Sequence, residues 1–261
     1  SCYNHVLLTG ALEITCGSKD MNNLVTITAA NKKRHFKLDD ATHKLTLRYL
    51  KLEGGDVSGA STAPDYYGGS IYNRNGGELS LHFTILYNNK AQRGGGIYAR
   101  GDSNTNTNNI IMNIYNSSII NNVATGPWDI GGGGIYMYKS IGHIYGSDIS
   151  NNECSSCIDG GMSIQYSDVS IQDTTISQNN GKSSTTTYYS TGDVTYGGRG
   201  VYIYGTNNHP TSVNITRCIV KNNGKYHNLY LKRRVTVTIR ETSFISTTSD
   251  LTNTNGHQLY A

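Results

Sequence analysis

The chain consists largely of short runs in which apolar and polar residues alternate, for example Leu79-Ser80-Leu81 and Val235-Thr236-Val237-Thr238-Ile239. A period of two over three to five residues predicts strands that bury one face and expose the other. No apolar repeat of helical spacing extends over ten or more residues. The pattern therefore predicts an all-β protein.

Two short sequence patterns recur along these runs. The first is an aliphatic residue that follows a glycine-rich or turn-rich stretch and usually precedes a tyrosine. It occurs at positions 71, 97, 135, 162, 201, 229 and 259, which lie 26 to 39 residues apart. A unit with constant chemistry and variable length is typical of a solenoid. We therefore expect a right-handed parallel β-helix with three short strands per coil and about seven to nine coils.

The second pattern is a β-branched residue followed three positions later by asparagine, as in Ile119 and Asn122. Asparagine tolerates the left-handed backbone of tight corners, and stacked side-chain amides can bond from coil to coil. We therefore expect an internal asparagine ladder, so that Asn152→Ala should destabilise the fold more than Tyr136→Ala. The predicted ladder consists of Asn88, Asn122, Asn152, Asn179 and Asn222.

The repeat also bears on domain organisation. Length alone would permit two domains, but no linker-like stretch interrupts the series. Each coil of a solenoid buries its apolar face against its neighbours, so a continuous repeat favours a single domain. Within it, residues 45–261 are expected to form regular β-helix coils and residues 1–44 irregular coils.

Alternation places the tyrosines that follow the glycine-rich corner on the outer face of their strands. Stacked at one-coil spacing, they would form an exposed amphipathic contact stripe with basic residues beside it. Such a stripe could bind sugars or another protein, or it could only stabilise neighbouring coils through an aromatic ladder. The predicted stripe consists of Tyr72, Arg74, Tyr98, Arg100, Tyr136, Tyr138, Tyr202, Tyr204, Tyr230 and Tyr260.

The sequence does not point to a catalytic site. Glycoside hydrolysis uses two carboxyl groups about 5 to 9.5 Å apart, and the tyrosine face offers no such pair. Asp39 and Asp40 are adjacent, so their side chains would point to opposite faces of a strand. We predict no catalytic residue, no metal and no cofactor. A different face could bring four other residues together as a catalytic group: Asp148, Asp168, Asp173 and His143. The simpler interpretation is that these residues lie in solvated turns.

The cysteines give limited information. Cys154 and Cys157 form a C-x-x-C motif without a following helix, a second such motif or a nearby histidine. A local disulfide or two plain thiols is therefore favoured over a redox or metal site. Cys2 and Cys16 bracket the first segment and are further candidates for disulfide formation, whereas Cys218 is expected to fill space.

The charge distribution and the glycosylation sequons give further expectations about partners. The net charge is +4, and basic residues cluster at residues 32–35 and 232–234. Neither cluster accompanies a nucleic-acid-binding module, so we expect solvated turns and no nucleic-acid partner. Asn116 and Asn214 begin N-glycosylation sequons. No run approaches the roughly 18 apolar residues of a membrane-spanning helix, so no membrane span is expected.

The pairing of a Gly-Gly-x-Ile turn with an aliphatic-x-x-Asn turn resembles the repeat of chlamydial polymorphic outer-membrane proteins and of other secreted parallel β-helix proteins of the pectin-lyase-like superfamily. The resemblance covers residues 45–261, although this chain carries isoleucine where the chlamydial motif prefers phenylalanine. It implies a parallel β-helix found at cell surfaces or outside cells. Members of these groups are adhesins, structural proteins or polysaccharide-active enzymes.

The expected function is therefore that of an extracellular or cell-surface structural or adhesive protein without catalysis. The alternative is a carbohydrate-active enzyme of the same fold, either a polysaccharide lyase or a glycoside hydrolase. The expected partners are an extracellular glycan or further copies of the chain. Because neither terminus offers a polar cap, head-to-tail self-association into a filament is a further expectation.

Overall fold

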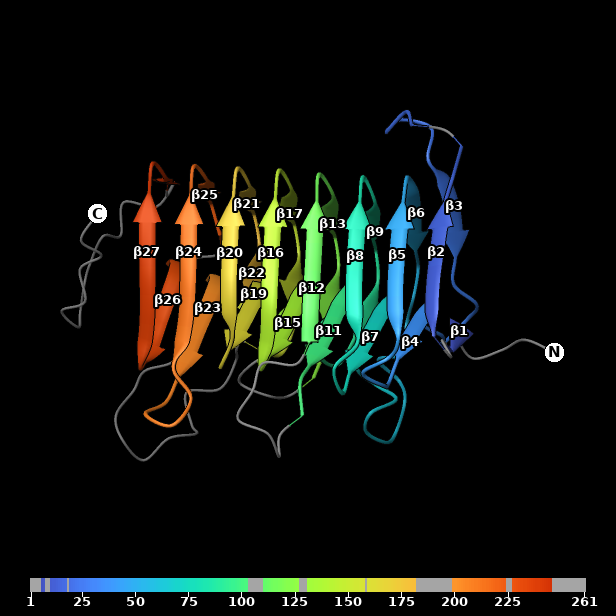
Figure 1. The fold of residues 1–261 in the computed structure, drawn as a ribbon, viewed down its shortest axis with the longest axis horizontal. Coiled ribbons are helices and arrows are strands. Elements are labelled where there is room, and N and C mark those ends of the chain that lie inside the picture. The colour runs from blue at the N-terminus through green and yellow to red at the C-terminus, as the bar shows by residue number, and fades with distance from the viewer. Residues whose placement is uncertain are drawn as a thin grey trace.

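The computed structural model describes residues 6–7, 10–17, 19–102, 110–126, 131–157, 159–181, 199–223 and 227–245. Every regular element in this part of the chain is a strand, and every strand pairing is parallel. Strands from successive repeats pair with one another, so the chain winds through the same sheets again and again (Figure 1). This arrangement confirms the all-β parallel β-helix.

Three long sheets form the walls of the solenoid. Sheet A contains β1 (Val6–Leu7), β4 (Phe36–Leu38), β7 (Ile71–Arg74), β11 (Ile97–Arg100), β15 (Ile135–Tyr138), β19 (Asp159–Gln165), β23 (Arg199–Gly205) and β26 (His227–Arg233). Sheet B contains β2 (Ala11–Thr15), β5 (Lys44–Arg48), β8 (Glu78–His82), β12 (Ile110–Tyr115), β16 (Ser140–Tyr145), β20 (Asp168–Gln172), β24 (Thr211–Thr216) and β27 (Val235–Arg240). Sheet C contains β3 (Val25–Thr28), β6 (Leu50–Glu53), β9 (Ile85–Tyr87), β13 (Ser118–Ile120), β17 (Asp148–Ser150), β21 (Thr175–Ser177), β25 (Ile219–Lys221) and β28 (Ser243–Ile245).

A fourth sheet was not predicted. Sheet D consists of two-residue strands that follow the asparagine corner, so a coil that contains one has four strands rather than three. Such short pairings carry too little alternation to be recognised in a sequence. Its strands are β10 (Lys90–Ala91), β14 (Val123–Ala124), β18 (Glu153–Cys154) and β22 (Asn180–Gly181).

The core follows the alternation along each strand. In sheet A, Ile71, Ile97, Ile135, Met162 and Val201 pair in register from coil to coil, and each is at most 1% exposed. They join inward residues of sheets B and C in one continuous apolar cluster. A one-residue slip would expose the whole inward set, so burial specifies the register.

The sheets continue through the N-terminal region without a break at residue 44. Strands β2, β3 and β4 pair with β5, β6 and β7 in the same order as later coils. The described part of residues 1–44 thus forms coils of the same architecture. Its inward residues Leu12, Ile14 and Ile27 are only partly buried, because they lie in the first strands of sheets B and C.

An asparagine ladder runs along the corner after sheet C, and its register corrects the prediction at both ends. The predicted Asn122, Asn152 and Asn179 are fully or almost fully buried, and each Nδ2 donates to the Oδ1 of the next asparagine at 2.9 to 3.0 Å. The remaining buried members are Asn89 and Asn223, not Asn88 and Asn222.

The error has a simple structural origin. Asn88 and Asn222 occupy the preceding corner position, where the backbone adopts φ near 53°. The inward residues three positions before the true ladder members are Leu86 and Val220, whereas the neighbouring Ile85 and Ile219 point outward. Where two aliphatic residues and two asparagines are adjacent, alternation alone does not decide which of each faces inward.

A second ladder was not predicted and lies along the corner between sheets B and C. The Oγ of Ser117 accepts from the backbone N–H of Thr84, and the Oγ of Ser147 accepts from that of Ser117. Each hydroxyl also donates to the carbonyl two residues before it. Cys218 is buried in the corresponding corner, where its Sγ contacts the Thr216 carbonyl.

Candidate functional site

The tyrosines of the predicted stripe lie on the outer face of sheet A, but four of them are covered. Tyr72, Tyr98, Tyr136 and Tyr202 are only 0 to 4% exposed, although they point away from the core lined by Ile71 and its equivalents. The expectation of an exposed stripe at these four positions is therefore wrong. The facing direction followed from alternation, whereas exposure depended on what packs above the sheet.

The cover includes loop residues that precede the strands of sheet A. The ring of Tyr67 stacks on Tyr98 with centroids 4.5 Å apart, and Tyr98 stacks in turn on Tyr72 and Tyr136 at 5.5 and 5.0 Å. The guanidinium of Arg34 lies over the Tyr72 ring at 5.0 Å. Burial raises the pKa of Tyr72 to about 12. We call Tyr72, Tyr98 and Tyr136 the buried tyrosine column.

The column is interrupted after Tyr136. Its position in β19 is taken by Ser163, and tyrosine resumes at Tyr202, which stacks on Tyr230 with centroids 5.9 Å apart. Tyr230 is half-buried. Tyr260 lies outside the described residues.

The far ends of the same strands remain accessible. Arg74, Arg100, Tyr138 and Tyr204 lie two residues beyond the covered tyrosines and are half-buried. Here sheet A turns into sheet B through a tight corner, in which Tyr166 adopts a left-handed φ of 50°. The contact residues that the sequence predicted are thus divided between a covered and an accessible row.

Aromatic and basic side chains gather along this accessible row. Tyr166 makes edge-to-face contacts with Tyr138 and Tyr204, with ring centroids 5.1 and 5.3 Å apart. Arg100 lies over the Tyr138 ring at 5.2 Å, and Arg233 over the Tyr204 ring at 5.7 Å. Arg233 also donates from Nη1 to the Tyr204 hydroxyl at 3.3 Å. We call Arg100, Tyr138, Tyr166, Tyr204 and Arg233 the tyrosine–arginine ridge.

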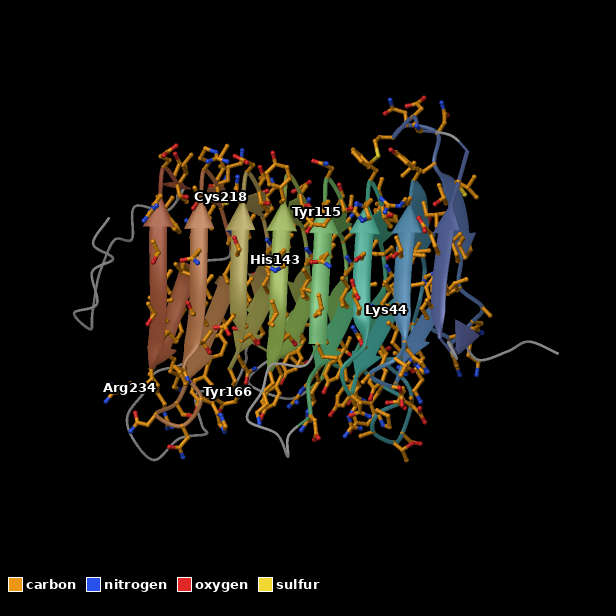
Figure 2. All side chains as sticks on the ribbon, viewed as in Figure 1. Lys44, Tyr115, His143, Tyr166, Cys218 and Arg234 are labelled. Atoms are coloured by element: carbon orange, nitrogen blue, oxygen red, sulfur yellow. A yellow bond between two sulfur atoms is a disulfide. The ribbon has the colours of Figure 1, made fainter. Side chains whose placement is uncertain are left out.

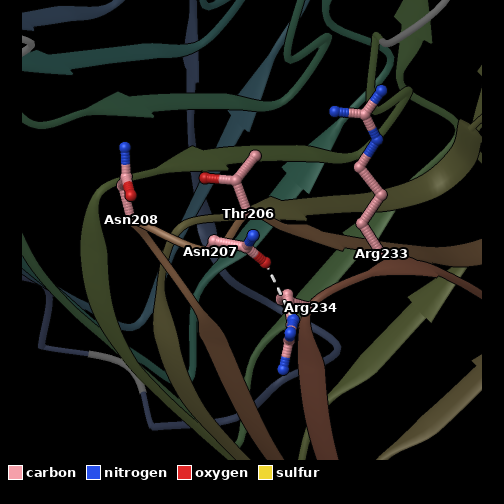
Figure 3. A pocket seen from close by; sticks show the side chains of 5 residues that line it. All are labelled: Thr206, Asn207, Asn208, Arg233 and Arg234. Atoms are coloured by element: carbon pink, nitrogen blue, oxygen red, sulfur yellow. Dashed lines mark hydrogen bonds between the residues drawn. The ribbon is translucent and has the colours of Figure 1, made fainter.

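An open pocket of about 570 Å³ adjoins the ridge at its C-terminal end (Figure 3). Its wall comes from the loop between β23 and β24 and from the corner after β26. Arg234 donates from Nε to the Asn207 Oδ1 at 2.8 Å, and none of the lining residues that the structure describes is acidic. The lining residues are Thr206, Asn207, Asn208, Arg233 and Arg234.

Sequence reasoning missed Tyr166, Arg234 and the loop residues of this pocket. The run 232–234 was visible as a basic cluster but was interpreted as a solvated turn. Figure 2 places Tyr166 and Arg234 along the same long edge of the solenoid, at the bottom of the view, where sheet A turns into sheet B. Residues 166, 204 and 233 are far apart in the sequence, and only the correct register between coils places them side by side.

The acidic residues considered for catalysis do not form one site. His143, at the centre of the outer face of sheet B in Figure 2, pairs with Ser170 rather than with an aspartate. Asp168 and Asp173 lie at opposite ends of β20, roughly 16 Å apart at the usual rise per residue. Asp173 is held by Arg217 through two hydrogen bonds of 2.7 and 2.8 Å. Asp148 lies on sheet C, where burial raises the pKa of its carboxyl.

The remaining carboxylates near the N-terminal coils are engaged locally. Asp39 pairs with Lys37 at 3.1 Å, and Asp40 accepts from the Thr42 backbone and hydroxyl. Across the part of the chain that the structure describes, no group of three or more histidine, cysteine, aspartate or glutamate residues could hold a metal ion.

The first basic cluster is not a solvated turn throughout. Arg34 and His35 are 4 and 5% exposed. His35 donates from Nε2 to the Ile27 carbonyl at 3.0 Å, and its Nδ1 lies 3.1 Å from the Ser70 hydroxyl. Burial lowers the pKa of His35 to about 4. Arg34 therefore belongs to the layer that covers sheet A, whereas His35 is a buried link between Ile27 of β3 and Ser70.

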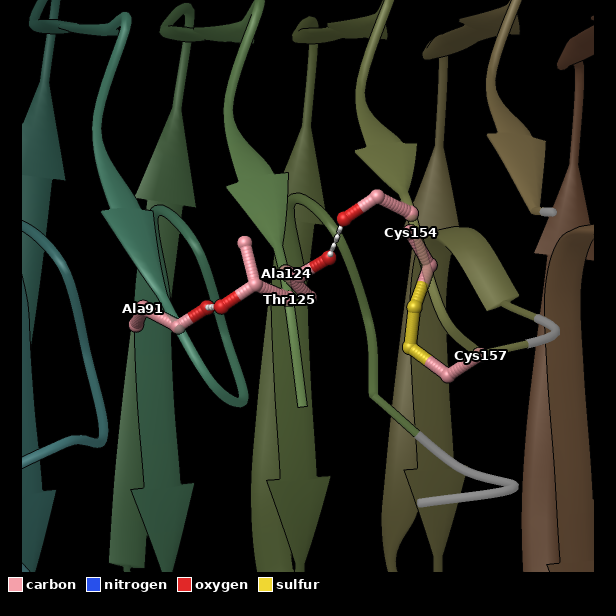
Figure 4. The surroundings of a disulfide bond; sticks show 6 residues. Ala91, Ala124, Thr125, Cys154 and Cys157 are labelled. Atoms are coloured by element: carbon pink, nitrogen blue, oxygen red, sulfur yellow. Dashed lines mark hydrogen bonds between the residues drawn. A yellow bond between two sulfur atoms is a disulfide. The ribbon is translucent and has the colours of Figure 1, made fainter. Parts of the chain in front are cut away.

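Cys154 and Cys157 form a disulfide within one corner (Figure 4). Cys154 pairs in register with Ala124, which pairs with Ala91, and Ala124, Cys154 and Cys157 make a satellite apolar cluster. A side chain at Gly131 would overlap Cys157 Sγ, so glycine is required there. Cys16 carries a free, half-buried thiol, and Cys2 lies outside the described residues.

Both sequon asparagines are exposed. Asn116 lies in the corner after β12 with φ of 46°, and Asn214 points outward from the middle of β24. A glycan at either position would extend away from the core. Among the described residues, no helix is long and apolar enough to cross a membrane.

Comparison with protein-family models, curated proteins and solved structures finds no match to this chain. The relation to chlamydial polymorphic outer-membrane proteins or to the pectin-lyase-like superfamily therefore stays a prediction. What the structure supports is the coarser statement that the chain is a parallel β-solenoid.

Proposed function

We propose that this protein is a non-catalytic β-helix of the cell surface or extracellular space, with a structural and adhesive role. Its contact surface is the tyrosine–arginine ridge with the adjoining pocket, and its partner is an anionic glycan. The fold supplies a rigid scaffold, because each coil is bonded to its neighbours through several sheets and through two side-chain ladders.

The observation that carries this proposal is a basic, polar pocket that adjoins an aromatic ridge, with no acidic residue among the described lining residues. Guanidinium groups bind carboxylate and sulfate oxygens through paired, charge-assisted hydrogen bonds. Tyrosine rings offer apolar faces to the C–H faces of sugar rings while their hydroxyls stay wet. Arg233 lies over the Tyr204 ring and also lines the pocket together with Arg234, so both features meet on one accessible surface.

Other basic groups are less suited to this role. On the outer face of sheet B, Lys44 pairs with Glu78 at 3.0 Å and Arg48 with Glu13 at 2.8 Å. Their charges are thus locally compensated. The ridge and its pocket are favoured over the sheet face because, among the described residues, Arg233 bonds to a tyrosine and Arg234 to an asparagine rather than to carboxylates.

A binding titration with polygalacturonate and chondroitin sulfate tests the proposal. Arg233→Gln with Arg234→Gln should weaken binding about tenfold or more, since hydrogen bonds to charged groups contribute about 1.5 to 3 kcal/mol each. The matched control is Lys90→Gln, which removes an exposed charge on sheet D. Equal affinity in the double variant and the control would reject the ridge as the binding surface.

Turnover assays separate this proposal from the alternative of a carbohydrate-active enzyme. Neither new reducing ends nor unsaturated products should appear when the protein is incubated with these polymers. Turnover that disappears on Asp168→Asn or Asp173→Asn would establish an enzyme and overturn the non-catalytic assignment.

Head-to-tail assembly stays a prediction. The last described strand, β28, is followed by residues 246–261, which lie outside the described residues. Light scattering over a range of concentrations would test self-association directly.

A further inference from the structure

Two tyrosines of the ridge are arranged as a reactive pair. The rings of Tyr166 and Tyr204 are in edge-to-face contact, at 70° with centroids 5.3 Å apart. Both side chains are half-buried and reachable from solvent. Strands β19 and β23 are neighbours in sheet A, so the two tyrosines belong to adjacent coils although 38 residues separate them.

The geometry favours carbon–carbon coupling between these phenols. Coupling forms a bond between ring carbons ortho to oxygen, so it needs two phenol rings that touch and are not packed on both faces, as is true of these two half-buried rings. Rings of the buried tyrosine column are stacked instead, with Tyr98 and Tyr136 at only 5° between planes. Parallel rings packed on both sides would need to rotate before an in-plane bond could form between their edges.

We propose that Tyr166 and Tyr204 form an oxidative cross-linking site. Hydrogen peroxide, acting through a haem peroxidase, removes one electron and one proton from each phenol. The two phenoxyl radicals join at their ortho carbons, and the hydrogens on those carbons then move to the oxygens. In balance, two tyrosines and one hydrogen peroxide give one dityrosine and two waters. The new bond would join two adjacent coils covalently.

Neighbouring side chains bias the coupling toward this pair. Arg233 donates to the Tyr204 hydroxyl and lies over its ring, which holds that ring in place beside Tyr166. Tyr138 is the competing partner, since its ring lies 5.1 Å from Tyr166 at 87°. Burial raises the pKa of Tyr166, so it stays a phenol and loses its proton together with the electron.

The test treats the folded protein with a haem peroxidase and hydrogen peroxide, followed by proteolysis and mass spectrometry. The expected main product is a pair of peptides joined between Tyr166 and Tyr204 with the loss of two hydrogens. Tyr166→Phe should remove most of the dityrosine fluorescence, whereas Tyr87→Phe, which alters a half-buried tyrosine on sheet C, should retain it.

Stability provides a second readout. The cross-linked protein should melt at a higher temperature than the untreated protein, because the bond closes a long loop in the unfolded chain. Tyr166→Phe treated in the same way should show no such shift, and circular dichroism would verify that this variant folds. Cross-links that form mainly at other tyrosines, or fluorescence that survives in Tyr166→Phe, would overturn the proposal.

Discussion

The two ends of a strand in sheet A differ in exposure although their side chains share one face. In β15, Tyr136 is 4% exposed while Tyr138, two residues later, is half-buried. Strand β23 repeats the contrast with Tyr202 at 3% and Tyr204 half-buried. Side-chain direction is therefore not the same property as accessibility in this solenoid.

The difference follows from the connections at the two ends. At the glycine-rich end, loop residues fold back over the sheet, as Tyr67 does over Tyr98. Gly68, next to Tyr67 and with φ of 65°, permits the tight turn there, because a side chain at this position would overlap the Ile71 carbonyl. At the other end, a single residue separates β15 from β16 and β26 from β27, and the ridge tyrosines Tyr138, Tyr166 and Tyr204 are only half-buried. The covered end thus serves stability, and the uncovered end is available for contacts.

The largest loss of stability should come from removing a buried tyrosine ring at the covered end of a sheet A strand. Tyr98→Ala removes a ring stacked among Tyr67, Tyr72 and Tyr136 and should cost about 3 to 5 kcal/mol, as for other large buried aromatics. Tyr204→Ala at the uncovered end should cost about 1 kcal/mol or less. Urea unfolding of both variants measures the difference, and equal losses would mean that the cover contributes little.

This comparison also revises the ranking expected from sequence. Tyr136→Ala was expected to be milder than Asn152→Ala because the ring was expected to be exposed. Since Tyr136 is buried in the column, its truncation should be at least as costly as loss of the ladder asparagine. The same unfolding series decides the order.

A smaller loss of stability should appear on acidification, through the buried His35. Burial lowers the pKa of His35 from 6.5 to about 4, so the unfolded state takes up a proton that the folded state excludes. This contribution to stability is complete above pH 6.5 and should be lost as pH falls toward 4. The loss amounts to roughly 3 kcal/mol at 1.36 kcal/mol per pH unit.

His35→Gln supplies the matched control for this prediction. The variant should be less sensitive to pH between 6.5 and 4, whatever its stability at neutral pH. Thermal melts at intervals across that range would show it. An unchanged pH dependence would indicate that His35 becomes protonated in the folded protein.

The smallest difference in stability is expected at the asparagine corner, where a buried and an exposed asparagine are adjacent in sequence. Asn89 accepts from the Gly55 N–H at 2.8 Å and donates to Asn122 at 2.9 Å. Asn89→Ala should therefore cost about 2 kcal/mol, because buried polar groups lose their partners. Asn88→Ala changes an exposed side chain and should cost less. The reverse order in denaturant melts would restore the register expected from sequence.

The predictable part of this molecule was its repetition. The spacing of inward aliphatic residues identified the solenoid, and Asn122, Asn152 and Asn179 identified its ladder, because chemistry recurs at structurally equivalent corners. The candidate site was only partly predictable. Tyr138 and Tyr204 lie in regular strands, but Tyr166 belongs to a corner, and the loop at residues 206–208 carries no periodic signal.

Sequence by itself thus determined the class of fold and the face on which most strand residues lie. Side chains alternate with a period of two, and a one-residue shift in register would expose the buried face. Tertiary structure alone decided which outward residues stay accessible. Coverage depends on loops whose path over sheet A is set by packing between coils rather than by local pattern. The same packing joins Tyr166, Tyr204 and Arg233 into one surface, because only the coil register brings such distant residues into contact.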